Sequence, residues 1–309
     1  MDVSASKVIE VINLVKSYGT VKAVDQISFD VAQGEVFGML GPNGAGKTTT
    51  VEIIEGLRPA DGGSATVLGM DVSKATRAVK ERIGVQPQSP ALFPTLTVQE
   101  TIGFFANMYR KSLPAARILE LASLQTSRKV LFKNLSGGQQ QRLSVSLAFV
   151  NDPEIIFLDE PTTGLDPQAR RAMWDVIETF RRAGKTVVLT THYMEEAQRL
   201  CDRIAIMDYG KIIALDSPQR LIESNIRESA IQFKMRDYPG DAVLTALPDV
   251  SKVIREDEDV IVYTNNIPSA IAGLLGMASQ RSTELSELFV RQATLEDVFL
   301  KLTGKRIRD

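Results

Sequence analysis

The chain has little cysteine, little histidine and no excess of either charge. Its 309 residues include one cysteine, Cys201, and one histidine, His192. A single cysteine excludes an internal disulfide and is typical of a protein in a reducing compartment. The 36 basic and 38 acidic residues give a net charge of -2. This balance does not indicate a nucleic-acid-binding protein, for which a basic excess is usual.

The chain also lacks an apolar run that could cross a bilayer, which takes roughly 18 to 20 residues. The longest candidate, residues 267–278, falls short of that length and is typical of a core helix. Residues 1–7 have neither the basic start nor the apolar stretch of a signal peptide. We therefore expect the chain to remain where it is made, and any transport role to require a separate membrane partner.

One segment matches the phosphate-binding pattern G-x-x-x-x-G-K-[ST] at every position. Residues 41–48 read GPNGAGKT, after a predicted buried strand at 36–40 and before a helix predicted to begin near Lys47. Backbone amides of such a loop wrap the phosphates, the lysine neutralises phosphate charge, and the last hydroxyl ligates Mg²⁺. The predicted nucleotide contacts are Gly41, Asn43, Gly44, Ala45, Gly46, Lys47, Thr48 and Thr49.

Two adjacent carboxylates follow a second apolar strand. Asp159 and Glu160 close the run 155–158, and Pro161 ends it. We expect Asp159 to hold a magnesium ion, directly or through water. Glu160 is the predicted general base, a role that typically contributes about 10² to 10⁴ in rate.

The sequence Leu135-Ser136-Gly137-Gly138-Gln139 lies shortly before this strand. Together with the phosphate loop, it makes residues 1–225 resemble the ATP-binding cassette (ABC) ATPases. In that family, the residues matching Ser136, Gly137 and Gly138 contact ATP held by a second cassette. The helix that starts near Gln139 adds its dipole there. The resemblance therefore implies a head-to-tail dimer that encloses two ATP molecules.

The resemblance also implies roles for residues outside these motifs. Gln88 matches the glutamine that reaches Mg²⁺ and the attacking water, with Gln86 as a nearby rival that the register disfavours. His192 matches the switch histidine that hydrogen-bonds the γ-phosphate. Tyr18 matches an aromatic residue that stacks on adenine, a contact worth roughly 1 to 3 kcal/mol. Asp166 resembles the loop residue that couples the two sites of the dimer.

Alternating strand and helix patterns predict an α/β fold with a mostly parallel, covered sheet. Residues 8–36 are predicted to form short β-rich runs. The resemblance implies a helical subdomain at about 97–150 that carries the signature, and apolar residues at helical spacing from Val98 to Tyr109 agree with it.

Residues 226–309 are predicted to form a second, smaller α+β domain. The expected order is strand, helix, strand, strand, helix, strand, which is the ferredoxin-like pattern. A last helix is expected at 295–303. The six preceding elements are predicted at 229–235, 241–246, 250–255, 260–264, 267–278 and 283–290. This domain could reinforce the dimer, regulate it or dock the membrane partner, and we favour the first two roles.

Residues 34–42 and 293–304 make the chain resemble the ATP-binding subunits of daunorubicin-resistance-type exporters more closely than it resembles other cassettes. This resemblance implies an Mg²⁺-dependent ATPase that acts as a homodimer on the cytoplasmic face of the cell membrane. It would drive efflux of a drug, a lipid or a similar molecule through a separate permease. No residue identifies the substrate.

The alternative interpretation is a soluble ABC-type ATPase that acts on ribosomes or nucleic acid. Such proteins usually carry two cassettes or a long coiled coil. The single set of motifs and the absence of a basic excess disfavour this alternative.

Overall fold

The computed structural model describes residues 6–89, 91–226, 229–235, 238–256, 258–291 and 293–304. The chain divides into two compact units, with the division after Pro218. Helix α8 (Pro218–Asn225) begins at this division. The boundary predicted from the sequence, after residue 225, falls at the other end of the same helix.

The core of the first unit is a six-stranded sheet in the order β10-β9-β3-β8-β7-β6. Neighbouring strands are parallel except for the β9–β10 pair at one edge. Every residue of β3, β7 and β8 is buried, as expected for strands covered on both faces. The bounds are β3 (Val36–Leu40), β6 (Ile83–Gln86), β7 (Ile155–Asp159), β8 (Thr186–Thr191), β9 (Arg203–Asp208) and β10 (Lys211–Asp216).

A four-stranded antiparallel sheet, β2-β1-β4-β5, forms the N-terminal part of this unit. Its strands are β1 (Lys7–Tyr18), β2 (Val21–Ala32), β4 (Gly62–Val67) and β5 (Met70–Asp71). The prediction of short runs was wrong, because β1 and β2 have 12 residues each. Register shifts interrupt their pairing, and Asn13 and Gln26 have positive φ. Such bulges break the alternation that marks a long strand in a sequence.

The two sheets of the first unit share one hydrophobic core. Buried residues from both belong to a single cluster. At its centre the rings of Phe29 and Phe37 stack with centroids 5.2 Å apart. This packing fixes the N-terminal sheet against the strand that leads into the phosphate loop.

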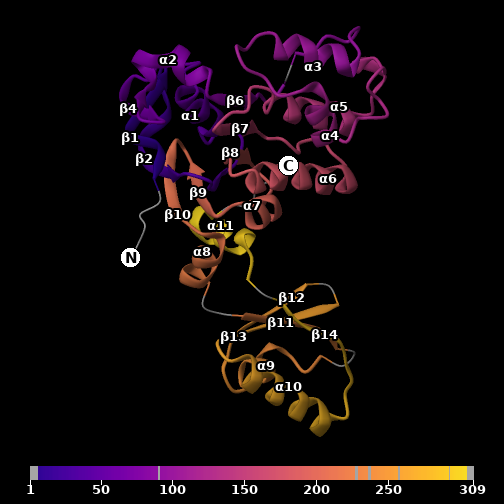
Figure 1. Cartoon of the computed structure of the whole chain (residues 1–309). Coiled ribbons are helices and arrows are strands. Elements are labelled where there is room, and N and C mark those ends of the chain that lie inside the picture. Colours follow the sequence, from indigo (N-terminus) through magenta and orange to yellow (C-terminus); the bar gives the residue numbers. More distant parts are fainter. Residues whose placement is uncertain are drawn as a thin grey trace. The chain divides into compact units, whose positions relative to one another are not determined.

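The described part of the first unit contains seven α-helices, which Figure 1 shows together with these sheets. They are α1 (Lys47–Ile54), α2 (Val72–Lys80), α3 (Val98–Ala106), α4 (Ala115–Leu121), α5 (Gly137–Leu147), α6 (Pro167–Arg182) and α7 (Met194–Leu200), with a 3₁₀ turn at Phe132–Asn134. Figure 1 shows α3, α4 and α5 grouped at one end of the unit, where the sequence predicted a helical subdomain. The helix predicted through Tyr109 is shorter than expected, since α3 ends at Ala106.

The second unit contains a four-stranded antiparallel sheet in the order β12-β13-β11-β14. After α8, the elements of this unit along the chain are β11 (Ser229–Met235), α9 (Asp241–Thr245), β12 (Val250–Glu256), β13 (Asp259–Thr264), α10 (Ile267–Arg281), β14 (Leu285–Arg291) and α11 (Leu295–Thr303). The predicted order of elements is therefore present. Helices α9 and α10 cover one face of the sheet, and their buried side chains share one apolar cluster with it (Figure 1).

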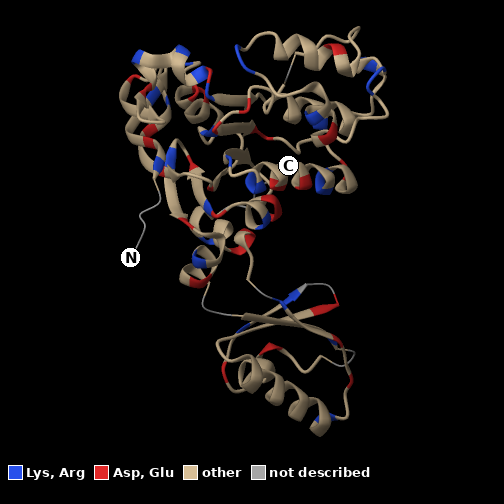
Figure 2. Cartoon of the chain, in the orientation of Figure 1, with Lys and Arg blue, Asp and Glu red and all other residues tan. Residues whose placement is uncertain are grey.

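Charged residues of both signs occur on both units (Figure 2). Within the described part of the chain, no helix combines the length and the apolar character that a membrane span requires.

Candidate active site

The loop between β3 and α1 can be built only with glycine at two positions. A Cβ at Gly41 would lie 2.3 Å from the carbonyl oxygen of Met207, and one at Gly46 would lie 2.1 Å from that of Ala23. Gly46 also has a φ of 100°. It is the N-cap of α1, and no side chain caps the helix. The first N–H groups of α1 are therefore available to an anion, which the helix dipole favours.

Lys47 is held inside this loop. Its side chain is 4% exposed, and its Nζ donates to the carbonyl oxygens of Gly41 at 2.7 Å and Pro42 at 3.1 Å. Oε1 of Glu160 lies 3.6 Å from the same nitrogen. Burial lowers the pKa of Lys47, although the neighbouring carboxylates oppose the shift. The amine thus lies at the uncapped start of α1, where phosphate oxygens would meet it.

Asp159 and Thr48 bring two hard oxygen donors together. Asp159 ends β7, and its Oδ1 accepts a hydrogen bond from Oγ1 of Thr48 at 3.2 Å. The same oxygen accepts from Oγ1 of Thr190 at the end of β8. Burial raises the pKa of Asp159, against the effect of both hydroxyls. A hydroxyl and a carboxylate beside a phosphate loop fit Mg²⁺, which keeps several waters and takes its remaining ligands from phosphate.

Glu160 has a strained backbone and a fixed side chain. Its φ is 48°, in the left-handed region that non-glycine residues rarely adopt. Its backbone N–H donates to Oγ1 of Thr190 at 3.0 Å. Oε2 accepts from Nε2 of Gln88 at 3.2 Å and from Oγ1 of Thr163 at 3.1 Å. Nδ1 of His192 lies 3.3 Å from the same oxygen, outside hydrogen-bond geometry.

The geometry distinguishes the two candidate glutamines. Gln88 contacts Glu160, whereas Gln86 is 1% exposed and its Nε2 donates to the backbone of Pro87. Lys47, Gln88, Glu160 and His192 therefore form one cluster, whereas Gln86 is buried and has no hydrogen bond to that cluster among the described residues. The contacts of Glu160 with Thr190 and Thr163 were not predicted, because hydroxyls are too common in sequences to indicate a site by themselves.

Tyr18 lies at the end of β1 with 43% of its surface exposed. The guanidinium carbon of Arg58 is 5.3 Å from its ring centroid, and Nζ of Lys16 is 5.8 Å from it. An exposed ring can stack on the base of a nucleotide, and the cations next to the ring would attract the negative phosphates of that nucleotide. Arg58 was not singled out by the sequence, since a lone arginine after a helix carries no signal.

The signature residues form a second, separate site. Ser136 caps α5: its Oγ accepts from the N–H of Gln139 at 3.3 Å, and Oε1 of Gln139 accepts from the N–H of Ser136 at 2.9 Å. Asp166 caps α6 by accepting from the N–H of Ala169 at 2.8 Å. Both caps border one cavity of about 350 Å³, which Gly137 and Gly138 also line.

The phosphate loop contributes no residue to the described lining of this cavity. The first unit thus holds two separate groups of predicted site residues. One has the phosphate loop and the carboxylates, and the other has the signature and Asp166.

Residues 24–163 match the family described as ABC transporter. Nod factor export ATP-binding protein I of Sinorhizobium fredii is 39% identical over 306 residues, which cover 97% of this chain and 87% of that protein. The chain belongs to the ATP-binding subunits of ABC transporters. Members of this family hydrolyse ATP and bind it with Mg²⁺, so the chain is a Mg²⁺-dependent ATPase.

Other comparisons agree with this family. The protein of the same name from Ralstonia nicotianae is 37% identical and covers 99% of this chain and 97% of its own length. A dimeric ATP-binding cassette in a post-hydrolysis state, bound to ADP and Pi, aligns with a TM-score of 0.62 at 26% identity, over 68% of this chain and 98% of that one. A component of an ABC transporter complex from Clostridium perfringens aligns with a TM-score of 0.64 at 25% identity, over 70% of this chain and 91% of that one.

Proposed function

We propose that this ABC subunit powers an exporter, as a head-to-tail homodimer beneath a separate membrane-spanning permease. The observation that carries the proposal is the separation of two groups of residues in the first unit, each of which would be a half-site of the dimer. The described lining of the signature cavity includes neither the phosphate loop nor the cluster around Lys47 and Glu160. The relatives named for Nod factor export and the dimeric cassette support the proposal.

Within one half-site, each residue has a task that follows from its position. The uncapped N–H groups of α1 and Nζ of Lys47 bind the phosphates. Thr48 and Asp159 would hold Mg²⁺, which would neutralise phosphate charge. Exposed Tyr18 stacks on the adenine.

Glu160 is the general base of the proposed reaction. In this structure its Oε1 contacts Lys47, and its Oε2 is held by Gln88. When Lys47 donates to phosphate instead, Oε1 is released and accepts the proton of the attacking water. Gln88 and Thr163 keep the carboxylate in place meanwhile, and the adjacent His192 contacts the γ-phosphate.

The second half-site completes the first in a dimer. Ser136 and the N–H groups of Gly137 and Gly138 lie at the start of α5, a helix of 11 residues whose dipole favours an anion. Facing the phosphate loop of another copy, they would contact its γ-phosphate. Asp166 lines the same cavity, so it would transmit the state of one site to the other.

The direction of transport is proposed from the relatives, and the substrate class remains a drug, a lipid or a similar molecule. We place the dimer on the cytoplasmic face of the membrane, held there by the permease. The strand order β14-β11-β13-β12 and the order of elements favour a ferredoxin-like second unit. For that unit we propose a role in strengthening or regulating the dimer.

The proposal is tested by light scattering on the Glu160→Gln protein, with and without Mg²⁺ and ATP. Because we expect this variant to bind ATP but to turn it over slowly, the mass should shift from monomer to dimer on addition of nucleotide. A monomer mass under all conditions, with ATP bound, would contradict the proposed dimer.

A further inference from the structure

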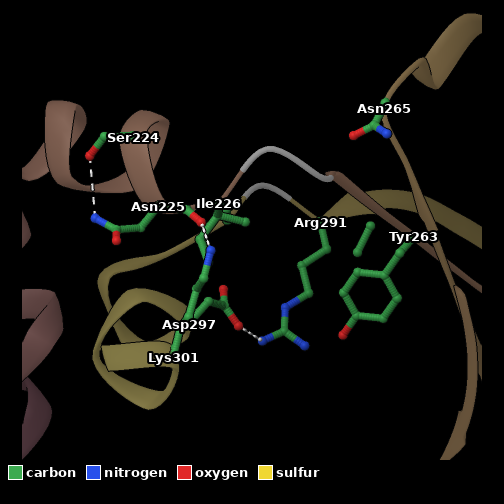
Figure 3. Close-up of a pocket in the computed structure, with 10 residues that line it drawn as sticks. Ser224, Asn225, Ile226, Tyr263, Asn265, Arg291, Asp297 and Lys301 are labelled. Carbon is green, nitrogen blue, oxygen red and sulfur yellow. Dashed lines mark hydrogen bonds and ion pairs between the residues drawn. The ribbon is translucent and has the colours of Figure 1, made fainter. Parts of the chain in front are cut away.

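The second unit contains a cavity of about 720 Å³ that no part of the proposed function uses. It lies between α8, α11 and the strands β13 and β14, and its residues are drawn in Figure 3. Ligand-binding cavities usually have volumes of about 300 to 1,000 Å³. The cavity is therefore large enough for a small metabolite.

Two cations border this cavity. Arg291 ends β14, and Lys301 belongs to α11. Figure 3 shows the guanidinium of Arg291 between Asp297 and the ring of Tyr263, whereas the amine of Lys301 turns toward the backbone of Asn225. Nζ of Lys301 donates to that neutral carbonyl oxygen. Among the described residues, no ion pair of Lys301 is present.

Asp297 is the acidic residue of the lining, and its charge is compensated twice. Its Oδ1 accepts from Arg291 at 3.3 Å. Its Oδ2 caps α11 by accepting from the N–H and the Oγ1 of Thr294, each at 2.9 Å. A carboxylate at a helix N-terminus is stabilised by the helix dipole. Arg291 can therefore turn from Asp297 to a ligand without leaving an uncompensated carboxylate.

The rest of the lining provides neutral contacts. Tyr263 is half-buried and presents its ring beside Arg291 (Figure 3). Ala230 and Ala293 add apolar surface, and Asn265 adds an amide. A ligand with one anionic group and a compact, partly apolar body matches this distribution.

We propose that the cavity binds a small molecule through a phosphate monoester group. Such a group carries a charge of about -1.5 to -2 at neutral pH. Two cations therefore match a phosphate monoester better than they match a carboxylate, which carries a single negative charge. Arg291 would bind two phosphate oxygens with its planar fork, and Lys301 would bind the third as a point charge. The remainder of the ligand would lie on Tyr263. This inference does not depend on the ATPase activity.

The test is a calorimetric titration of the full chain with phenyl phosphate, with the ATP site first saturated with Mg²⁺ and ADP. Hydrogen exchange followed by mass spectrometry locates the bound probe. We expect binding together with protection of β14 and α11. No binding at a phenyl phosphate concentration of about 10 mM, ten times a Kd of about 1 mM, would overturn the proposal. Protection confined to the phosphate loop would overturn it as well.

Three variants and a matched control separate binding from folding. Lys301→Met, on an exposed side chain, and Arg291→Lys, which removes the fork, should each weaken binding by about tenfold. Asp297→Asn should instead tighten it, because the carboxylate competes for Arg291. Lys234→Ala is the control, since Lys234 lies on β11 of the same sheet, paired with Glu287 and outside the cavity. Equal affinity in all four proteins would contradict the site.

The phosphate monoester could belong to a soluble metabolite or to a lipid headgroup. Glycerol 3-phosphate and vesicles that contain phosphatidic acid are the two probes. Binding of either one that Lys301→Met weakens supports the site and identifies its source. If neither binds more weakly to that variant, the cavity is a packing crevice and the proposal is wrong.

Discussion

Oε1 of Glu160 and Nζ of Lys47 lie 3.6 Å apart, and both side chains are about 95% buried. The predicted base and the lysine of the phosphate loop therefore neutralise each other in this structure. Because Lys47 also donates to two loop carbonyls, it is already directed toward the phosphate position. An arriving phosphate would compete with Glu160 for the amine, and so binding itself would free the base.

Replacing Glu160 with Gln removes the base but keeps the shape of the side chain. We expect phosphate release from ATP to slow by about 10² to 10⁴, the usual contribution of a positioned base. Binding of Mg²⁺ and ATP should persist, because Lys47 and Thr48 are unchanged. Steady-state phosphate release and nucleotide binding measure the two effects, with Glu154→Gln, on an exposed side chain, as the control. Turnover near that of the unchanged protein would remove Glu160 from this role.

Replacing Lys47 with Met leaves the buried carboxylate of Glu160 without its cation. Breaking a buried ion pair from one side typically costs about 3 to 5 kcal/mol. We expect a lower free energy of unfolding for the first unit in the absence of nucleotide, and a much smaller loss in the double variant Lys47→Met/Glu160→Gln. Denaturant titration measures both.

The exposed pair Arg117 and Glu120, with 2.7 Å between its atoms, supplies the comparison. Arg117→Met should cost less than about 1 kcal/mol, as is usual for exposed pairs. If Lys47→Met and the double variant Lys47→Met/Glu160→Gln lost the same unfolding free energy, the carboxylate of Glu160 would not need Lys47 to compensate its charge.

The two glutamines of the loop after β6 provide a matched pair. Gln88→Ala should lower turnover and leave the fold intact, because among the described residues the side chain of Gln88 is hydrogen-bonded only to the carboxylate of Glu160. Gln86→Ala should instead lower the melting temperature, since Gln86 is 1% exposed and its Nε2 donates to the backbone of Pro87. ATPase assays and thermal unfolding of both proteins distinguish the roles. The opposite pattern would give Gln86 the functional position.

Glu55, the residue after α1, should make stability depend on pH. Burial, reinforced by the charges of Asp159 and Glu52, raises its pKa from 4.5 to about 8. The folded state therefore holds a proton that the unfolded state releases. Its contribution to stability is fully present below pH 4.5 and is lost as the pH rises through about 8.

Glu55→Gln removes this dependence. The difference in unfolding free energy between the variant and the unchanged protein should grow by a few kcal/mol from pH 5 to pH 8, at about 1.4 kcal/mol for each pKa unit. Glu120→Gln is the control, because Glu120 is exposed and pairs with Arg117 at 2.7 Å, away from Glu55. A difference that stays constant over this range for Glu55→Gln would show that its carboxyl is not protonated when folded.

The sequence predicted those parts of the site that depend on spacing along the chain. The loop from Gly41 to Thr48 and the pair Asp159 and Glu160 are local patterns whose chemistry fixes the residue types. Contacts between distant segments leave no such pattern. Thr190, for example, meets Asp159 across 31 positions.

The same limit explains the errors in the fold. Bulges hid the length of β1 and β2, because alternation fails where residues such as Asn13 turn to positive φ. The left-handed backbone of Glu160 was also not predicted; it occurs where β7 pairs with β8 and where the N–H of Glu160 donates to Thr190. Strain of this kind is a property of the folded neighbourhood and not of a motif.

The central claim is that a complete ATP site needs the phosphate loop of one copy and the signature of another. Lys47→Ala and Ser136→Arg should each abolish turnover alone, because both sites of either homodimer are then damaged. In an equal mixture, half of the dimers would be mixed and would hold one intact site, so about a quarter of the turnover should return. No recovery, although the mixed dimers form, would contradict the account.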